Sequence, residues 1–143
     1  MIRQAESKDI ESIKRLFKEV TGEESTDAEI LNLLQQITTQ TFESLYVFEY
    51  NASIVGALGF RVIEKNDSKS RYGEISVIVV SEKYQKKGLG KQLMEYAKNL
   101  ALENKCSGTW LASGFGRKEK AHQFYRSRGY LPTGFKFFKH NTN

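Results

Sequence analysis

The stretch ISVIVVSEKYQKKGLGKQLMEYAKNLA, residues 75–101, contains a change of pattern that determines the fold prediction. Its first residues, up to Val80, are almost all apolar, which is typical of a strand covered on both faces of a sheet. From Leu89 onward the apolar residues recur three to four positions apart, which predicts an amphipathic helix. Where the two patterns meet, Gly88 and Gly90 stand among lysines.

A second strand is predicted after this helix, over residues 108–113. A strand, a helix and a strand in succession make a βαβ unit. The strands at 73–80 and 108–113 should therefore be parallel neighbours with a right-handed crossover.

Further strands and helices are predicted on both sides of this unit along the chain. Apolar and polar residues alternate over residues 44–50 and 54–64 with a turn at 51–53, which predicts a β-hairpin. A strand at 2–5 precedes a helix for which we expect Ser7 as the N-cap and Gly22 as the end. The capping-box pair Thr26 and Glu29 predicts the start of a second helix. The end of the chain predicts a short helix at 118–127 and one or two strands carrying Phe135 and Phe137.

These elements predict one α+β domain over residues 1–143, with a mostly antiparallel sheet, one parallel strand pair and helices on both faces. No apolar run approaches the length of about 20 residues that crosses a bilayer, and the N-terminus lacks the layout of a signal peptide. We therefore expect a cytoplasmic protein with no membrane partner. Cys106 is the only cysteine, which excludes an internal disulfide, and we expect no metal.

The net charge of +5 raises the question of a nucleic-acid partner. The basic residues are interleaved with acids along the chain, and no aromatic platform or recognition helix accompanies them, so we expect no nucleic-acid partner. Their one cluster surrounds the two glycines, and it indicates a local site for an anion. The cluster consists of Lys83, Lys86, Lys87 and Lys91.

The loop into the helix has the parts of a diphosphate site. The first N–H groups of a helix have no intrahelical partner, and the helix dipole adds positive charge there. Gly88 and Gly90 let an oxygen-rich ligand approach the backbone. The spacing matches neither a P-loop, because Gln92 follows Lys91, nor a dinucleotide-binding turn, because Leu93 occupies the position of its third glycine. An ordinary solvated loop is the alternative reading.

Two separate segments carry a family resemblance. VVSEKYQKKGLGKQLM, residues 79–94, resembles the acetyl-coenzyme A motif of the GNAT superfamily of N-acetyltransferases, through Gln85, Gly88 and Gly90. AHQFYRSRGY, residues 121–130, resembles a second motif of that family, and the order of the elements also matches.

The resemblance implies that acetyl-coenzyme A is the acetyl donor and that its pantetheine arm lies where the two parallel strands splay apart. The positions implied for the pantetheine arm are Ile78, Val79 and Val80, and those implied for the diphosphate are Gln85, Lys86, Lys87, Gly88, Leu89, Gly90 and Lys91.

The implied reaction is direct transfer of acetyl to an amine. The backbone N–H of Val80 is the expected donor to the carbonyl oxygen, and Tyr125 the expected proton donor to the departing thiolate, with a core tyrosine as the alternative. Glu74 is the candidate base, directly or through water, because we expect it to begin the central strand. A solvated charge at the strand end is the other reading of Glu74.

The leading hypothesis for the acceptor is a primary amine of a small molecule. A protein N-terminus or lysine is the close alternative, and a non-catalytic module that senses acyl-coenzyme A is a different class. The Phe-rich terminal segment leaves a homodimer open.

Overall fold

The computed structural model describes residues 1–39, 43–64, 70–111, 119–131 and 139. The chain forms two compact units, Met1–Ala112 and Ser113–Asn143. The first unit contains the sheet and three helices, and the second contains one described helix. One domain over residues 1–143 stays a prediction.

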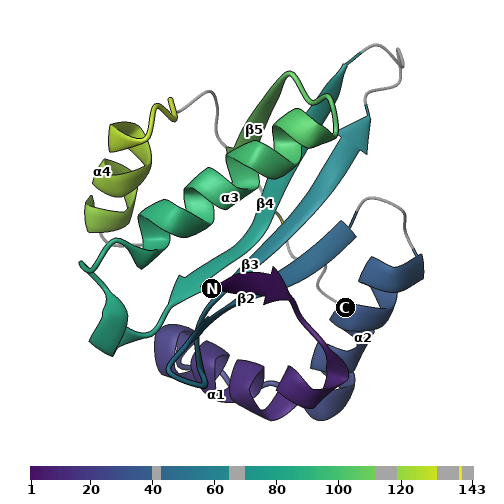
Figure 1. Cartoon of the computed structure of the whole chain (residues 1–143), viewed down its shortest axis with the longest axis vertical. Helices are drawn as coiled ribbons and strands as arrows, with labels where there is room; N and C mark the ends of the chain where they lie inside the picture. Colours follow the sequence, from purple (N-terminus) through teal and green to yellow (C-terminus); the bar gives the residue numbers. More distant parts are fainter. Residues whose placement is uncertain (40–42, 65–69, 112–118, 132–138, 140–143) are drawn as a thin grey trace. The chain divides into compact units, whose positions relative to one another are not determined.

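In the described residues, the sheet of the first unit has five strands in the order of the sequence (Figure 1). Neighbouring strands are antiparallel except β4 and β5, which are parallel. This arrangement confirms the predicted α+β fold and the βαβ unit. The strands are β1 (Ile2–Gln4), β2 (Glu43–Tyr50), β3 (Ser53–Glu64), β4 (Arg71–Val80) and β5 (Gly108–Leu111).

The predicted hairpin is β2 and β3, joined at Asn51 and Ala52, which have φ angles of 49° and 60°. Two successive left-handed residues are the hallmark of a tight turn whose twist matches the strands it connects.

Helices α1 (Ile10–Thr21) and α2 (Asp27–Thr39) follow β1. Gly22 ends α1 in the left-handed conformation as predicted, and its N–H donates to the carbonyl of Lys18 at 2.8 Å. The start predicted for α1 is wrong, because Ser7 begins a 3-10 turn, η1 (Ser7–Asp9), whose N-cap is Glu6. The predicted start of α2 is confirmed, since Thr26 Oγ1 accepts the N–H of Glu29 at 3.1 Å.

Helices cover both faces of the sheet. Leu16 of α1 packs with Ala57 and Val79 on one face. On the other face lies α3 (Leu89–Glu103), whose Leu93 is so close that a Cβ on Gly56 would be 3.3 Å from its Cδ1. Because successive strand residues point to opposite faces, Gly56 and Ala57 identify the two sides. The sheet is therefore the middle layer of the first unit.

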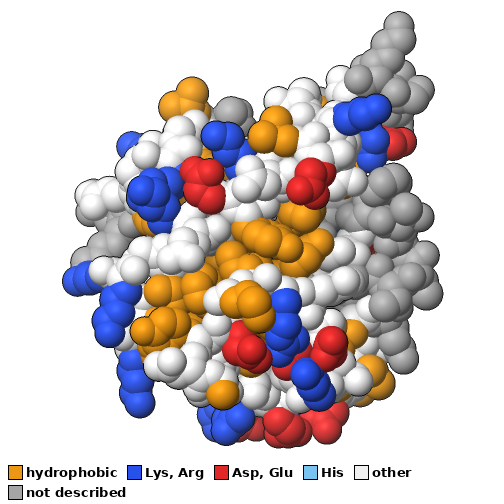
Figure 2. All heavy atoms as spheres, viewed as in Figure 1, with side chains coloured by type: hydrophobic (Ala, Val, Ile, Leu, Met, Phe, Trp, Pro, Cys, Tyr) orange, Lys and Arg blue, Asp and Glu red, His pale blue; other side chains and the backbone are white. Residues whose placement is uncertain are grey.

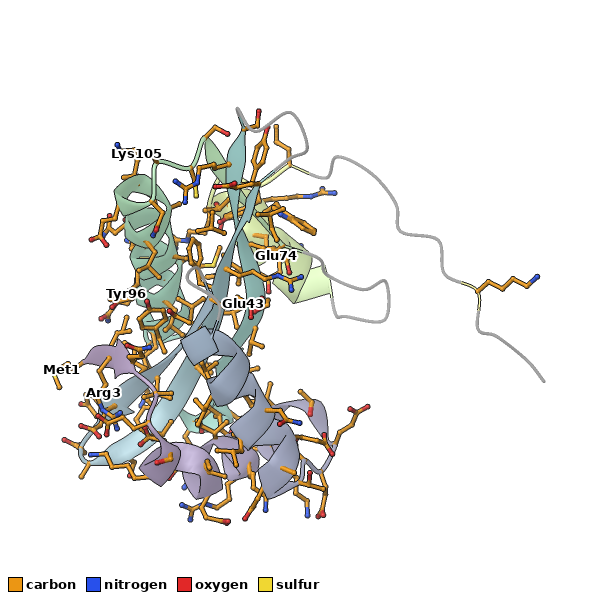
Figure 3. All side chains as sticks on the ribbon, turned by 90° about the vertical axis from the view of Figure 1, so that its right-hand side faces the viewer. Met1, Arg3, Glu43, Glu74, Tyr96 and Lys105 are labelled. Carbon is orange, nitrogen blue, oxygen red and sulfur yellow. The ribbon has the colours of Figure 1, made fainter. Side chains whose placement is uncertain are left out.

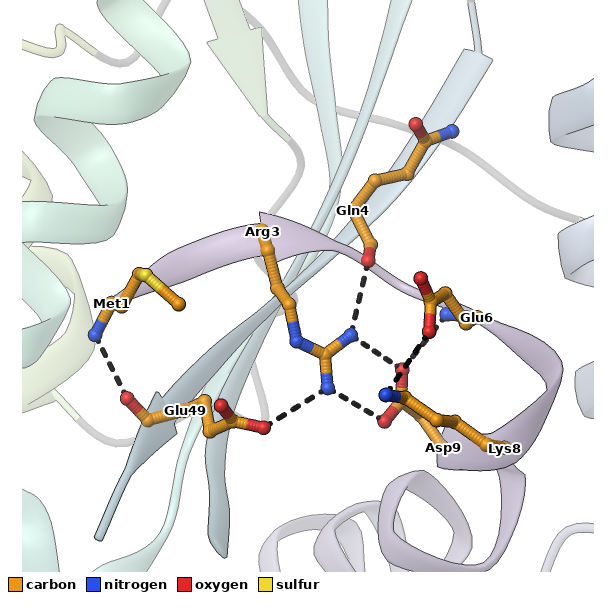
Figure 4. Close-up of polar contacts among 7 residues, drawn as sticks. All are labelled: Met1, Arg3, Gln4, Glu6, Lys8, Asp9 and Glu49. Carbon is orange, nitrogen blue, oxygen red and sulfur yellow. Dashed lines mark hydrogen bonds and ion pairs between the residues drawn. The ribbon is translucent and has the colours of Figure 1, made fainter. Parts of the chain in front are cut away.

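A polar network ties β1 to the rest of the first unit (Figure 4). Arg3 donates from its two Nη atoms to the carboxylate of Asp9 at 2.8 and 2.9 Å, and Nη2 also donates to Glu49 at 3.1 Å. Asp9 is buried, so these bonds matter for stability. The hydrogen bonds from Arg3 hold the pKa of Asp9 below its usual value.

The second unit contains α4 (Glu119–Ser127), which agrees with the short helix predicted near the C-terminus. The turn after it places the N–H of Tyr130 3.1 Å from the carbonyl of Tyr125. The terminal strands predicted around Phe135 and Phe137 lie outside the described residues. Within the described part of the chain, no helix is long and apolar enough to span a membrane.

Candidate functional site

As far as β5 is described, to Leu111, its parallel ladder covers the first half of β4. It runs from the pair Tyr72 and Gly108 to the pair Ile75 and Leu111. The next residue, Ser76, has no partner on β3, because the register shifts there and β4 bulges. A β-bulge bends its strand and increases its twist. Among the described residues, β4 beyond Ser76 pairs with β3 alone.

Gly59 of β3 makes room for this bulge. A Cβ atom at Gly59 would lie only 2.5 Å from the hydroxyl oxygen of Ser76. The bulge in β4 thus has a local cause on the neighbouring strand β3.

At the end of β4, successive peptide groups point alternately toward β3 and away from it. The N–H of Ser81 donates to the carbonyl of Val55 on β3 at 2.8 Å. Because alternate residues of an antiparallel strand face its partner, the peptide groups of Ile78 and Val80 point away from β3. The Val80 carbonyl accepts a hydrogen bond from Gln85 Nε2 at 3.0 Å. No described residue accepts a hydrogen bond from the Val80 N–H.

The loop after β4 has an alternating backbone. It begins with the 3-10 turn η2 (Glu82–Tyr84) and continues through Gln85, which is extended. Lys86 and Gly88 have φ angles of 63° and 86°, and Lys87 between them does not have a positive φ. Such alternation points successive N–H groups toward one side and forms an anion-binding concavity.

No side chain in the described parts of the chain caps the N-terminus of α3. Gly88 is the N-cap residue, and the helical bonds begin with Gln92 N–H to the Gly88 carbonyl at 3.1 Å. No described group accepts a hydrogen bond from the N–H of Leu89, Gly90 or Lys91, and the first turn contains no acidic residue. These N–H groups and the helix dipole therefore remain available to an anion.

Positive charge surrounds this concavity. The side chains of Lys86, Lys87 and Lys91 are exposed, as sequence reasoning expected. Lys87 Nζ lies 5.5 Å from the centroid of the Tyr84 ring. In Figure 2, basic side chains project from the edge where Figure 1 shows the loop before α3. The arrangement can attract and hold a polyphosphate group.

Glu74 lies elsewhere on β4 than the sequence suggested. β4 begins at Arg71, so Glu74 is inside the strand, and it is buried rather than solvated. Arg61 of β3 donates to Glu74 Oε1 from Nε at 2.9 Å and forms an ion pair through Nη2 at 2.6 Å. Arg61 also reaches Glu43 of β2 at 3.5 Å, so Arg61 links two carboxylates on neighbouring strands. Figure 3 labels both of these carboxylates, Glu43 and Glu74.

One oxygen of Glu74 remains available beside this ion pair. The Nε and Nη2 atoms of Arg61 both contact Oε1 of Glu74. No described group donates a hydrogen bond to Oε2 of Glu74. A carboxylate oriented through one oxygen can accept a hydrogen bond or a proton through the other. This partner, Arg61, was missed by sequence reasoning, because the pairing of β3 with β4 carries no local signal.

Tyr125 lies in the second unit. Its side chain is 9% exposed, and its ring centroid lies 5.6 Å from that of Phe124 and 6.5 Å from that of Tyr130. Aromatic neighbours on and just after α4 thus pack against its ring.

Cys106 is the one cysteine of the chain. Cys106 is half-buried, and burial raises the pKa of its thiol, which lowers the fraction of nucleophilic thiolate. Among the residues that the structure describes, no His, Cys, Asp and Glu side chains gather as a metal site.

A contact without any sequence signal joins Glu19 of α1 to the residues after β4. The Glu19 carboxylate accepts hydrogen bonds from the Ser81 hydroxyl at 3.2 Å and from the Glu82 N–H at 2.7 Å. It therefore joins α1 to the point where the loop leaves β4.

Comparison with known proteins agrees with this geometry. The family model described as "Acetyltransferase (GNAT) family" matches residues 9–130. The chain therefore belongs to the GNAT family of acetyltransferases, and the family resemblance seen in the sequence is confirmed.

Solved structures with low sequence identity share the fold. A transcriptional regulator from Bacillus halodurans C-125 matches with a TM-score of 0.88 and 20% identity, covering 99% of each chain. Glucosamine-6-phosphate N-acetyltransferase from Arabidopsis thaliana matches with a TM-score of 0.80 and 21% identity, covering 98% of this chain and 97% of that one. An aminoglycoside antibiotic 6'-N-acetyltransferase from Acinetobacter haemolyticus matches with a TM-score of 0.82 and 15% identity, covering 100% and 99%.

Proposed function

We propose that this protein transfers the acetyl group of acetyl-coenzyme A to a primary amine of a small molecule by direct attack. The observation that carries the proposal is the uncapped N-terminus of α3, preceded by left-handed residues at Lys86 and Gly88. Together they present unpaired N–H groups and positive charge to one ligand, as a diphosphate requires.

The coenzyme would be held mainly by backbone groups. The N–H groups from Gln85 to Lys91 would bind the diphosphate, with lysine side chains adding charge. The pantetheine arm would lie along the edge of β4 at Ile78, Val79 and Val80, where the peptide groups of Ile78 and Val80 face away from β3. Bound there, acetyl-coenzyme A supplies an activated acetyl group as a thioester.

Three groups of the chain would carry the chemistry. Glu74 Oε2 would accept a proton from the amine through a relay of water molecules, because the six residues that separate it from Val80 span about 20 Å of strand, while Arg61 holds the other oxygen. This step is needed because an alkyl ammonium, with a pKa of about 10.4, is almost fully protonated at neutral pH. The Val80 N–H would stabilise the negative charge that develops on the carbonyl oxygen. Tyr125 would donate a proton to the departing thiolate.

A small acceptor is supported by two proteins of the same fold, which by their names act on glucosamine-6-phosphate and on aminoglycosides. Acetylation of a protein N-terminus or lysine is the alternative, as is a sensor of acyl-coenzyme A without turnover. The cytoplasmic location, the homodimer and the lack of a nucleic-acid partner stay predictions.

The test begins with binding. Calorimetry with acetyl-coenzyme A should show binding at one site per chain, and absence of binding would refute the proposal. A panel of small amines, including amino sugars, aminoglycosides and polyamines, is then incubated with enzyme and acetyl-coenzyme A while free thiol is recorded. Thiol release that depends on one of these amines supports the proposal.

The alternatives give different results in the same assay. Release of free thiol only with peptide substrates would favour acetylation of a protein amine instead. Binding without release, for both amines and peptides, would favour the sensor. Salt-dependent binding of RNA or DNA that coenzyme A fails to displace would favour a nucleic-acid binder.

A further inference from the structure

Glu19 sits where its charge does not benefit its own helix. It lies in the last turn of α1, which ends at Thr21, and its side chain is exposed. A negative charge near a helix C-terminus is disfavoured by the helix dipole. The hydrogen bonds that stabilise Glu19 come instead from residues outside α1.

Both carboxylate oxygens of Glu19 contact the chain directly after β4. Oε1 accepts from the hydroxyl of Ser81 at 3.2 Å, and Oε2 accepts from the N–H of Glu82 at 2.7 Å. Glu82 is the first residue of η2, so the carboxylate caps a free N–H group at the start of this turn. Hydrogen bonds to an ionised acceptor are stronger than those between neutral groups.

The contacted residues set the direction in which the loop leaves the sheet. Ser81 is fixed on one side by its N–H bond to Val55, and its carbonyl accepts the N–H of Tyr84 at 2.9 Å. The side chain of Gln85 then returns to the Val80 carbonyl. Glu19 supplies the link from this turn to α1, which packs on β3 and β4 through Leu16.

We infer that Glu19 is a positioning residue that fixes the loop between β4 and α3 in the conformation that binds the diphosphate of the acetyl donor. The inference rests on the proposed function. Glu19 does not touch the ligand; it orients the turn from which Lys86, Lys87 and the N-terminus of α3 follow. Without it, the loop would have to be ordered during binding, and affinity for the donor would fall.

The experiment compares Glu19→Ala and Glu19→Gln with Glu11→Ala. Glu11 is another exposed glutamate of α1, and its ion pair with Lys14 at 3.8 Å lies within that helix. Glu19→Ala removes both hydrogen bonds and should raise the Kd and KM for acetyl-coenzyme A about tenfold, with kcat changing less than about twofold. Glu19→Gln keeps one acceptor oxygen and should have an intermediate effect. Glu11→Ala should bind like wild type.

Amide hydrogen exchange without ligand gives a second readout. The Glu82 amide should exchange faster in Glu19→Ala than in wild type or Glu11→Ala, because its acceptor is lost. Wild-type affinity in Glu19→Ala, even with reduced thermal stability, would reduce Glu19 to a structural role and overturn the inference. If wild type itself fails to bind acetyl-coenzyme A, the proposed function fails as well, so the two failures are distinguishable.

Discussion

Replacing Gly88 by alanine tests whether the backbone before α3 is shaped for the ligand. Gly88 has a φ of 86°, and a Cβ atom built on it would meet no atom within 4 Å. Alanine therefore causes no collision there, and its whole effect comes from the left-handed conformation. The chain provides a matched control in Gly22, which has a φ of 79° and is equally open, but lies at the end of α1.

The magnitude follows from the conformation. A residue with a Cβ in the left-handed region costs about 1–2 kcal/mol relative to the right-handed one. At Gly88 this cost is divided between stability and affinity, because an exposed loop can relax without ligand and must return to the left-handed form when ligand binds. If all of it appears in binding, the Kd for acetyl-coenzyme A rises about five- to thirtyfold. At Gly22 the cost appears in stability alone.

The assay combines urea unfolding with calorimetric titration of acetyl-coenzyme A for wild type, Gly88→Ala and Gly22→Ala. We expect the losses of stability and affinity in Gly88→Ala to sum to about 1–2 kcal/mol, and Gly22→Ala to lose stability with unchanged affinity. If both variants weaken the affinity for acetyl-coenzyme A equally, the loss at Gly88 is a general effect of the alanine substitution, and the loop is not shaped for the ligand. Wild-type affinity and stability in Gly88→Ala would refute the reasoning about the left-handed loop.

Three further predictions concern other parts of the chain. Tyr125→Phe should keep its affinity for acetyl-coenzyme A and lose about a hundredfold in turnover, as expected for a general acid; wild-type turnover would remove Tyr125 from the mechanism. Asp9→Asn should lower the free energy of unfolding at pH 7 by about 2 kcal/mol, because the charged bonds to Arg3 are lost. Since the pKa of Asp9 is lowered in the folded state, its contribution is complete above the usual value of 3.8 and disappears as the pH falls through the lowered pKa. The stability gap to wild type, measured by urea unfolding, should therefore narrow below pH 3.8, and a constant gap would contradict this. Leu93→Ala removes a fully buried side chain and should cost about 2–5 kcal/mol in the same unfolding assay, and a cost below about 1 kcal/mol would mean that α3 packs loosely on the sheet.

The sequence alone was enough for the βαβ unit, the β2–β3 hairpin and the position of the glycine-containing loop before α3. Each depends on residues close together along the chain. Apolar periodicity identifies β4 and α3, and Gly88 and Gly90 mark the start of the helix, Gly88 as its N-cap and Gly90 in its first turn. The helix end at Gly22 was predicted for the same reason, because a left-handed glycine commonly ends a helix.

The tertiary structure alone decided the bulge at Ser76, the pairing of Glu74 with Arg61 and the contact from Glu19 to the loop. The bulge arises from the register between β3 and β4, and the ion pair joins residues that face each other on those strands. Glu19 and Glu82 are separated by 63 positions in the chain. The physical reason is that hydrophobic periodicity records which face of an element is buried, whereas a hydrogen bond between distant residues depends on register and helix position, which only the packed chain fixes.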